Sequence, residues 1–175
     1  MKMLIAVEDK LFGQALADFV VSHPWKDVPE FKIVNVVEQL KYLVPTLTGM
    51  SDTRYLDVVE ERQRLGKSLV LAIGTALRQS FPHAKMEELI VNGDPKSRIL
   101  DLAQEWEADM IVMGSHGRSG MERMVLGSVS LAVLAHAPCS VAIVRLPEEK
   151  AKAVEERLGD VQSKSTEVSS GNCRA

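Results

Sequence analysis

The sequence predicts an α/β fold: an open, twisted, five-stranded parallel sheet with helices on both faces. Short apolar segments rich in β-branched residues alternate with longer segments whose apolar residues recur at helical spacing. Parallel neighbouring strands need crossover connections, and the right-handed crossovers place helices over the sheet. A chain of 175 residues is long enough to bury one core of this kind without disulfides or a structural metal.

The first half of the chain predicts two strands and two helices. Residues 3–7 are a short apolar run, and the apolar residues that follow share one helical face until Pro24 ends the helix. Residues 31–37 carry the β-branched density of a second buried strand. Residues 38–53 are interrupted by proline and glycine, which predicts a mobile irregular insertion before a long helix at about residues 55–80. Two glycines weaken that helix locally.

The second half adds three strands and two helices. Residues 86–91 predict the third strand, after which Asp94 caps a helix that has proline at its first position. Residues 110–113 predict the fourth strand. Ser128 is predicted to cap the last core helix, and residues 141–144 predict the fifth strand.

Composition restricts the class of protein. We expect one domain over residues 1–147, followed by a charged helix and a flexible polar tail over residues 148–175. A formal net charge of −3 disfavours nucleic acid as a partner. No apolar run approaches the length that spans a bilayer, and no export signal opens the chain, so we expect no membrane association and a cytoplasmic location. Cys139 and Cys173 form no metal-binding or redox pair.

A glycine-rich segment follows the fourth strand directly. Residues 114–120 read GSHGRSG, and residues 127–130 read GSVS at the start of the next helix. Glycines let backbone N–H groups approach an anion closely. The helix N-terminus adds unpaired N–H groups and a favourable dipole. The segment therefore predicts a phosphate-binding loop, although the glycines at 114 and 117 are also consistent with a simple tight turn.

The spacing G-x2-G-x9-G-S, from Gly114 to Ser128, resembles the ATP-binding signature of the universal stress protein family. Residues 93–95, 108–113 and 137–141 are also similar to segments of this family. The resemblance implies a three-layer, Rossmann-like fold of the adenine nucleotide alpha hydrolase type, with ATP as the ligand. It also implies Mg²⁺ carried mainly through the phosphates, because no carboxylate is clearly placed as its ligand.

The resemblance implies two groups of binding residues. The phosphate and ribose side comprises Met113, Gly114, His116, Gly117, Arg118, Gly127, Ser128, Val129 and Ser130. The base and sugar side comprises Val7, Glu8, Asp9, Val36 and Val37. We assign no catalytic residue: His116 is interpreted as a hydrogen-bonding or ribose contact, and Arg118 either screens phosphate charge or is a solvated surface arginine.

The chain departs from the family pattern after the first strand. Family members usually carry an aspartate followed by two small residues there, whereas this chain reads Glu8-Asp9-Lys10. Either Glu8 or Asp9 takes the carboxylate role, and larger side chains reduce the room for adenine.

Three functions are consistent with these patterns. The first is an ATP-binding regulatory or stress-response protein with slow or no hydrolysis, homodimeric through residues 141–144 and read by an unknown protein partner. The second is a weak ATPase or a nucleotidyl transferase, but the chain lacks the GxxxxGK[ST] loop and any lysine in the glycine segment. The third is a dimeric scaffold of the same family that acts without nucleotide.

Overall fold

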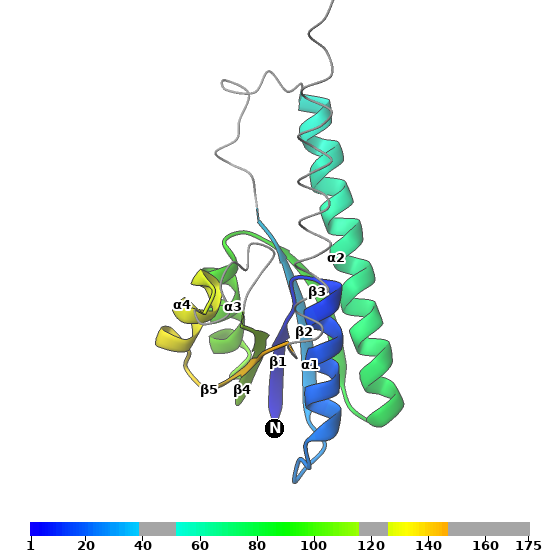
Figure 1. The fold of residues 1–175 in the computed structure, drawn as a ribbon, viewed down its shortest axis with the longest axis vertical. Helices are drawn as coiled ribbons and strands as arrows, with labels where there is room; N and C mark the ends of the chain where they lie inside the picture. Colours follow the sequence, from blue (N-terminus) through cyan, green and yellow to red (C-terminus); the bar gives the residue numbers. More distant parts are fainter. Residues whose placement is uncertain (39–51, 116–125, 147–175) are drawn as a thin grey trace, which may run out of the picture. The chain divides into compact units, whose positions relative to one another are not determined.

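Five parallel strands form one sheet with helices on both faces (Figure 1). The computed structural model describes residues 1–38, 52–115 and 126–146. In chain order the elements are β1 (Lys2–Ala6), α1 (Lys10–Ser22), β2 (Glu30–Val37), α2 (Asp52–Ser80), β3 (Met86–Asn92), α3 (Pro95–Glu105), β4 (Met110–Gly114), α4 (Ser128–His136) and β5 (Ser140–Val144). The predicted fold class and element order are confirmed. Most of the predicted insertion at 38–53, and all of the predicted tail at 148–175, lie outside the described residues.

The strand order is β3-β2-β1-β4-β5, so the direction of winding reverses between β1 and β4. Strand β1 pairs with both central neighbours, and Ala6 lies opposite Val34 on one side and Met113 on the other. In open parallel sheets, ligands bind beyond the carboxyl ends of the strands at such a reversal. The strand order therefore predicts a ligand site at the carboxyl ends of β1 and β4.

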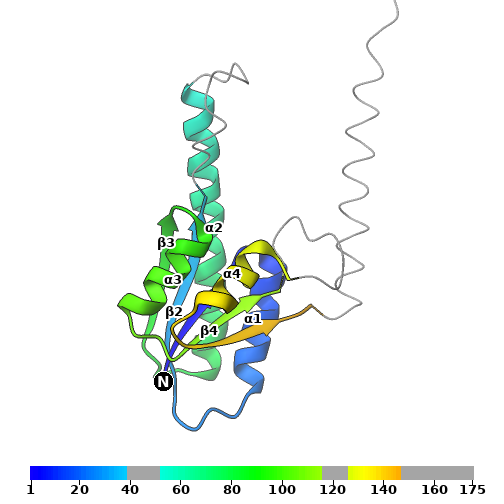
Figure 2. The same cartoon turned by 90° about the vertical axis from the view of Figure 1, so that its left-hand side faces the viewer.

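Helices α1 and α2 cover one face of the sheet, while α3 and α4 cover the other (Figures 1 and 2). Strand β1 is fully covered, because the side chains of Met3, Leu4 and Ile5 have no exposed surface. Because side chains alternate along a strand, Leu4 packs in a core cluster that includes Ile99 of α3 and Val133 of α4. We call it the α3–α4 cluster. Burial of each such aliphatic side chain stabilises the fold by about 1.5–3 kcal/mol.

Two glycines of α2 lie directly over polar side chains of the sheet. A Cβ atom at Gly66 would meet the amide oxygen of Asn35, and one at Gly74 would meet the carboxylate of Glu88. Glu88 also accepts a 2.6 Å hydrogen bond from Arg78. The glycines that weaken helix propensity in the sequence thus allow close approach between α2 and two polar groups of the sheet.

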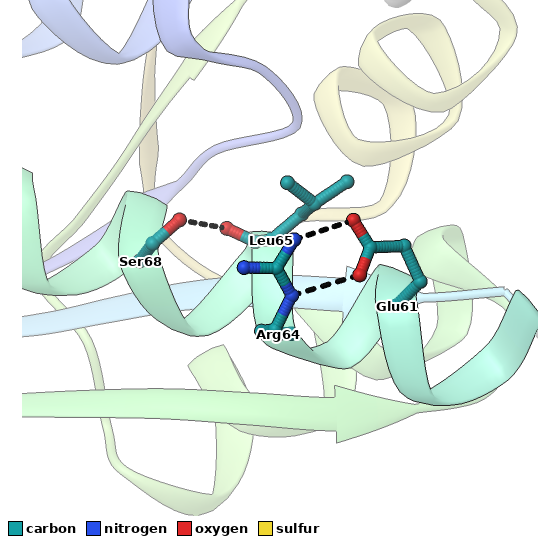
Figure 3. A network of polar contacts seen from close by, with 4 residues as sticks. All are labelled: Glu61, Arg64, Leu65 and Ser68. Carbon is teal, nitrogen blue, oxygen red and sulfur yellow. Dashed lines mark hydrogen bonds and ion pairs between the residues drawn. The ribbon is translucent and has the colours of Figure 1, made fainter. Parts of the chain in front are cut away.

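The outer face of α2 satisfies its polar groups within the helix (Figure 3). The guanidinium of Arg64 donates two hydrogen bonds, of 2.8 and 2.7 Å, to the carboxylate of Glu61. These bonds lower the pKa of Glu61. The hydroxyl of Ser68 donates to the carbonyl of Leu65 at 2.8 Å. The solvent-exposed ion pair between Arg64 and Glu61 contributes little to stability.

The N-cap of α3 gives a pH-dependent prediction. The Asp94 carboxylate accepts hydrogen bonds from the backbone N–H and hydroxyl of Ser97, at 3.0 and 2.9 Å, and the backbone bond is the largest cause of its lowered pKa. The Asp94→Ala substitution is expected to lower the free energy of unfolding by about 1 kcal/mol at neutral pH. Because the folded-state pKa lies below the ordinary 3.8, this difference is lost as the pH falls below 3.8.

Urea denaturation across this pH range measures the difference. Asp101→Ala is the control, because Asp101 is an exposed carboxylate of the same helix that makes only a 3.6 Å ion pair with Arg98. An equal loss in both variants, or a loss that does not change with pH, would contradict the capping role.

Candidate functional site

The ends of β1 and β4 lie side by side at the point where the strand order reverses. Strand β4 extends one residue beyond the Ala6–Met113 pair and ends at Gly114. The backbone continues into Ser115, which is 2% exposed and donates its N–H to the carbonyl of Val144 at 2.9 Å. The start of the glycine segment is therefore fixed to both β4 and β5.

Hydrogen bonds clamp the two ends of the glycine segment together. The N–H of Gly127 donates to the carbonyl of Ser115 at 2.8 Å. The hydroxyl of Ser130 donates to the carbonyls of Gly114 and Ser115, at 2.9 and 3.2 Å. We call these contacts the loop clamp. Since a hydroxyl carries a single proton, the donor capacity of Ser130 is directed to the loop backbone.

The N-terminus of α4 opens beside the clamp. Gly127 is its N-cap residue in an extended conformation (φ −60°, ψ 158°), and among the described residues no side chain caps the helix. The prediction that Ser128 caps the helix is wrong, because Ser128 is the first helical residue and is exposed. The first N–H groups of a helix have no acceptor within the helix, so this end offers donors and a positive partial charge to an anion. Its nine residues contain no acidic side chain in the first turn.

The first glycine of the segment packs against an aromatic ring of α1. A Cβ atom at Gly114 would lie 2.5 Å from Cδ1 and 2.9 Å from Cγ of Phe12. Phe12 is 7% exposed and belongs to the core. The glycine at position 114 therefore has a packing role in addition to the loop role that the sequence predicts.

The two candidate carboxylates after β1 have different environments. One oxygen of Asp9 accepts the backbone N–H groups of Leu11 and Phe12, at 2.8 and 2.9 Å, and caps α1. The side chain of Glu8 is exposed. The structure thus assigns a helix-capping role to Asp9, and the choice of the sugar-side carboxylate stays a prediction.

The other residues predicted for the base and sugar side are Val7, Val36 and Val37. Val7 is 4% exposed, and its N–H donates to the carbonyl of Val34 at 2.9 Å. Adjacent residues on a strand face opposite sides of the sheet. Val36 packs against the α3–α4 cluster, whereas Val37 is 5% exposed and accepts the N–H of Gly93 at 3.1 Å through its carbonyl. The two valines therefore do not form one continuous side-chain wall.

The remaining candidate residues divide into two sets. Met113 is a buried member of the α3–α4 cluster and Val129 packs against it, so their side chains serve the core. His116, Gly117 and Arg118 lie outside the described residues, and their predicted contacts stay predictions.

The hollow found in the described part of the chain lies at the opposite end of the sheet. Its volume is about 690 Å³, and it is lined by residues at the amino ends of the strands, including Lys2, Glu30 and Lys85. Lys85 and Glu30 form a 2.7 Å ion pair that lowers the pKa of Glu30. Lys2 also pairs with Glu107, at 3.7 Å, and the hollow lies away from the carboxyl ends of the strands, so the candidate site stays where the strand order reverses.

Known proteins match this chain over the residues that form the sheet and its helices. The sequence profile of the universal stress protein family matches residues 1–145. The chain belongs to the universal stress protein family. Universal stress protein Sll1388 of Synechocystis sp. is 45% identical over 151 residues, which cover 82% of this chain and 97% of that protein. Universal stress protein YxiE of Bacillus subtilis is 30% identical over 145 residues, covering 82% and 98%.

Solved universal stress proteins share the fold. The universal stress protein UspA of Lactobacillus plantarum superposes with a TM-score of 0.70 at 26% identity, covering 83% of this chain and 97% of that chain. The Archaeoglobus fulgidus protein, solved in complex with dAMP, gives 0.55 at 20% identity and covers 82% and 97%. The Arabidopsis thaliana protein with AMP bound gives 0.59 at 18% identity and covers 86% and 94%.

Sequence reasoning missed three residues at this universal stress protein site. Ser115 lies within the glycine segment without a predicted role, although its carbonyl accepts two bonds of the loop clamp and its N–H bonds β5. Phe12 lies on the apolar helical face that follows residues 3–7, and nothing in the sequence links it to Gly114. Asn35 is a buried polar side chain within the apolar strand β2, and that anomaly was the available signal.

Three further observations concern the described residues. They contain no group of three histidine, cysteine or acidic side chains placed to hold a metal ion. Within the same residues, no helix is long and apolar enough to cross a membrane. Cys139 is a free, half-buried cysteine beside the α3–α4 cluster, and burial raises the pKa of its thiol. The raised pKa disfavours the reactive thiolate.

The contact between Phe12 and Gly114 predicts strong coupling. The Gly114→Ala substitution is expected to lower the free energy of unfolding by about 1–3 kcal/mol, because its methyl group overlaps the ring. In a Phe12→Ala background the same methyl group fills part of the cavity, so the substitution becomes neutral or stabilising. Urea denaturation of the four proteins in a double-mutant cycle measures the coupling. Additive effects would show that the two residues do not share this space.

Proposed function

We propose that this universal stress protein binds ATP at the carboxyl ends of β1 and β4 and acts as a nucleotide-dependent regulatory protein with slow or no hydrolysis. The observation that carries the proposal is the uncapped N-terminus of α4, held against the glycine segment by the loop clamp. An N-terminus of this kind suits the phosphates of a nucleotide.

Relatives support the class of ligand. The solved proteins of Archaeoglobus fulgidus and Arabidopsis thaliana contain dAMP and AMP, and another universal stress protein was solved in complex with cAMP. These ligands share an adenine, a sugar and a phosphate. Our proposal extends them to ATP because the segment from Gly114 to Ser128 has the length and glycine spacing to surround a polyphosphate.

In the proposed mechanism, ATP occupies the site and a protein partner recognises the ATP-bound state. The backbone N–H groups at Ser128, Val129 and Gly117 bind the phosphates, and Mg²⁺ is held through those phosphates. His116 and Gly114 lie toward the ribose, and Arg118 screens charge. Nothing in this scheme activates a water molecule, so bound ATP persists and stabilises one conformation or assembly.

The proposed assembly is a cytoplasmic homodimer through β5. Within the described part of the sheet, β5 pairs only with β4 and so presents an edge. Its residues Val141, Ala142 and Ile143 are half-buried. Pairing with a second copy would cover this apolar edge and leave both candidate nucleotide sites in the dimer.

Isothermal titration tests the proposed site directly. Gly127→Val is expected to weaken ATP binding at least about tenfold, because a branched side chain would stand where phosphate approaches the first turn of α4. The backbone at Gly127 is extended, a conformation that valine adopts without strain, so the fold is expected to survive. Gly117→Val is expected to give a similar loss.

Ala135→Val is the matched control, because Ala135 is exposed near the other end of the same helix. Unchanged affinity in both glycine variants would remove the proposed loop role. A parent protein that binds no ATP would favour the nucleotide-independent scaffold, and turnover above about 1 s⁻¹ would favour an enzyme.

A further inference from the structure

Asn35 extends the hydrogen-bond ladder of the sheet by one position. It lies within β2, is 5% exposed, and donates its side-chain N–H to the carbonyl of Val7 at 2.8 Å. Val7 follows the last residue of β1, and its own N–H donates to the carbonyl of Val34. A side-chain amide therefore holds the backbone at the point where the chain leaves the sheet.

Helix α2 fixes this amide from the other side. Gly66 is buried against it, with the Cβ position 3.1 Å from Cγ of Asn35 and 3.4 Å from Cδ1 of Ile90. Its neighbours Leu65 and Ser68 are exposed, and the Ser68 hydroxyl bonds back to the helix (Figure 3). A side chain at position 66 would overlap the amide oxygen of Asn35, so either α2 or the amide would have to shift.

The held carbonyl lies immediately before the predicted sugar-side carboxylates. The chain from Val7 to Leu11 is secured at both ends, by Asn35 at the carbonyl of Val7 and by the Asp9 carboxylate at the start of α1. Glu8 lies between these two points. Its backbone is therefore expected to respond to any change in the contact between Asn35 and Val7.

We infer that Asn35 is a positioning residue for the base and sugar side of the nucleotide site, and that Gly66 is the position in α2 that leaves space for it. The inference rests on the proposed function for its ligand. It acts through the backbone of Val7 and Glu8, and it requires no direct contact between Asn35 and the nucleotide.

The chain contains a matched control for this inference. Gly74 lies on the same face of α2, eight residues further along, and packs on the polar side chain of Glu88 in the same way. Glu88 lies on β3, which β2 separates from β1, and it accepts a hydrogen bond from Arg78. A purely structural role predicts that alanine at Gly66 and at Gly74 has the same consequences, whereas a positioning role predicts that only Gly66 affects the nucleotide.

The first readout is the choice of ligand, measured by titration with ATP and with tripolyphosphate. Asn35→Ala and Gly66→Ala are expected to weaken ATP binding about tenfold, because the base and sugar lose their fixed support. Tripolyphosphate has no base or sugar, so its affinity is expected to change less than about twofold. Gly74→Ala is expected to leave both affinities unchanged, because Glu88 is not bonded to the backbone at Val7.

The second readout needs no nucleotide. Amide hydrogen exchange over residues 8–12 is expected to become about tenfold faster in Asn35→Ala and Gly66→Ala, and to stay as in the parent protein in Gly74→Ala. Gly66→Ala keeps every polar group, so it decides the outcome if Asn35→Ala does not fold. Circular dichroism establishes folding in each variant.

The outcomes separate the inference from the proposed function. Equal exchange in the Gly66→Ala and Gly74→Ala variants would overturn the positioning role, whatever the parent protein binds. Faster exchange with unchanged ATP affinity would also overturn it, because the held backbone would then not serve the ligand. A parent protein that binds no ATP would end the proposed function, and the exchange result would still decide whether Asn35 holds the end of β1.

Discussion

The site depends on the loop clamp that joins the exit of β4 to the start of α4. The carbonyl of Ser115 accepts both the N–H of Gly127 and the hydroxyl of Ser130, which also bonds Gly114. Ser115 is itself bonded to Val144 of β5. The N-terminus of α4 is therefore held in place relative to the sheet. An anion site built from backbone N–H groups needs this rigidity, since donors that move must be ordered again each time a ligand binds.

Close packing links the clamp to the other face of the sheet. Phe12 of α1 occupies the space that a side chain at Gly114 would need, and its N–H is held by the Asp9 carboxylate. The exit of β1, the start of α1 and the exit of β4 therefore form one packed unit. Asn35 joins this unit to β2, and Gly66 allows α2 to lie on it. Residues from both faces thus support the same carboxyl end of the sheet, where β4 leads into Gly114 and Ser115.

Much of the fold could be predicted because its signals are local. Aspartate followed by proline marked the start of α3, and the structure begins that helix at Pro95 with Asp94 as its cap. The uninterrupted apolar run of β1 predicted a strand buried on both faces. The contacts that shape the site are not local: whether Phe12 meets Gly114, or Asn35 meets Val7, depends on which strands are neighbours. The sequence left Glu8 and Asp9 as alternatives because both precede α1, and only the backbone shows that Asp9 is the N-cap residue whose carboxylate bonds the first turn.

The central claim is that the N-terminus of α4 receives phosphate. Titration of the isotopically labelled protein with ATP, followed by the backbone amide resonances of residues 128–130, tests it most directly. The account predicts saturable shifts of these resonances that fit one dissociation constant, together with smaller shifts near Val7. Shifts confined to the hollow at the amino ends of the strands, around Lys2 and Lys85, would contradict it.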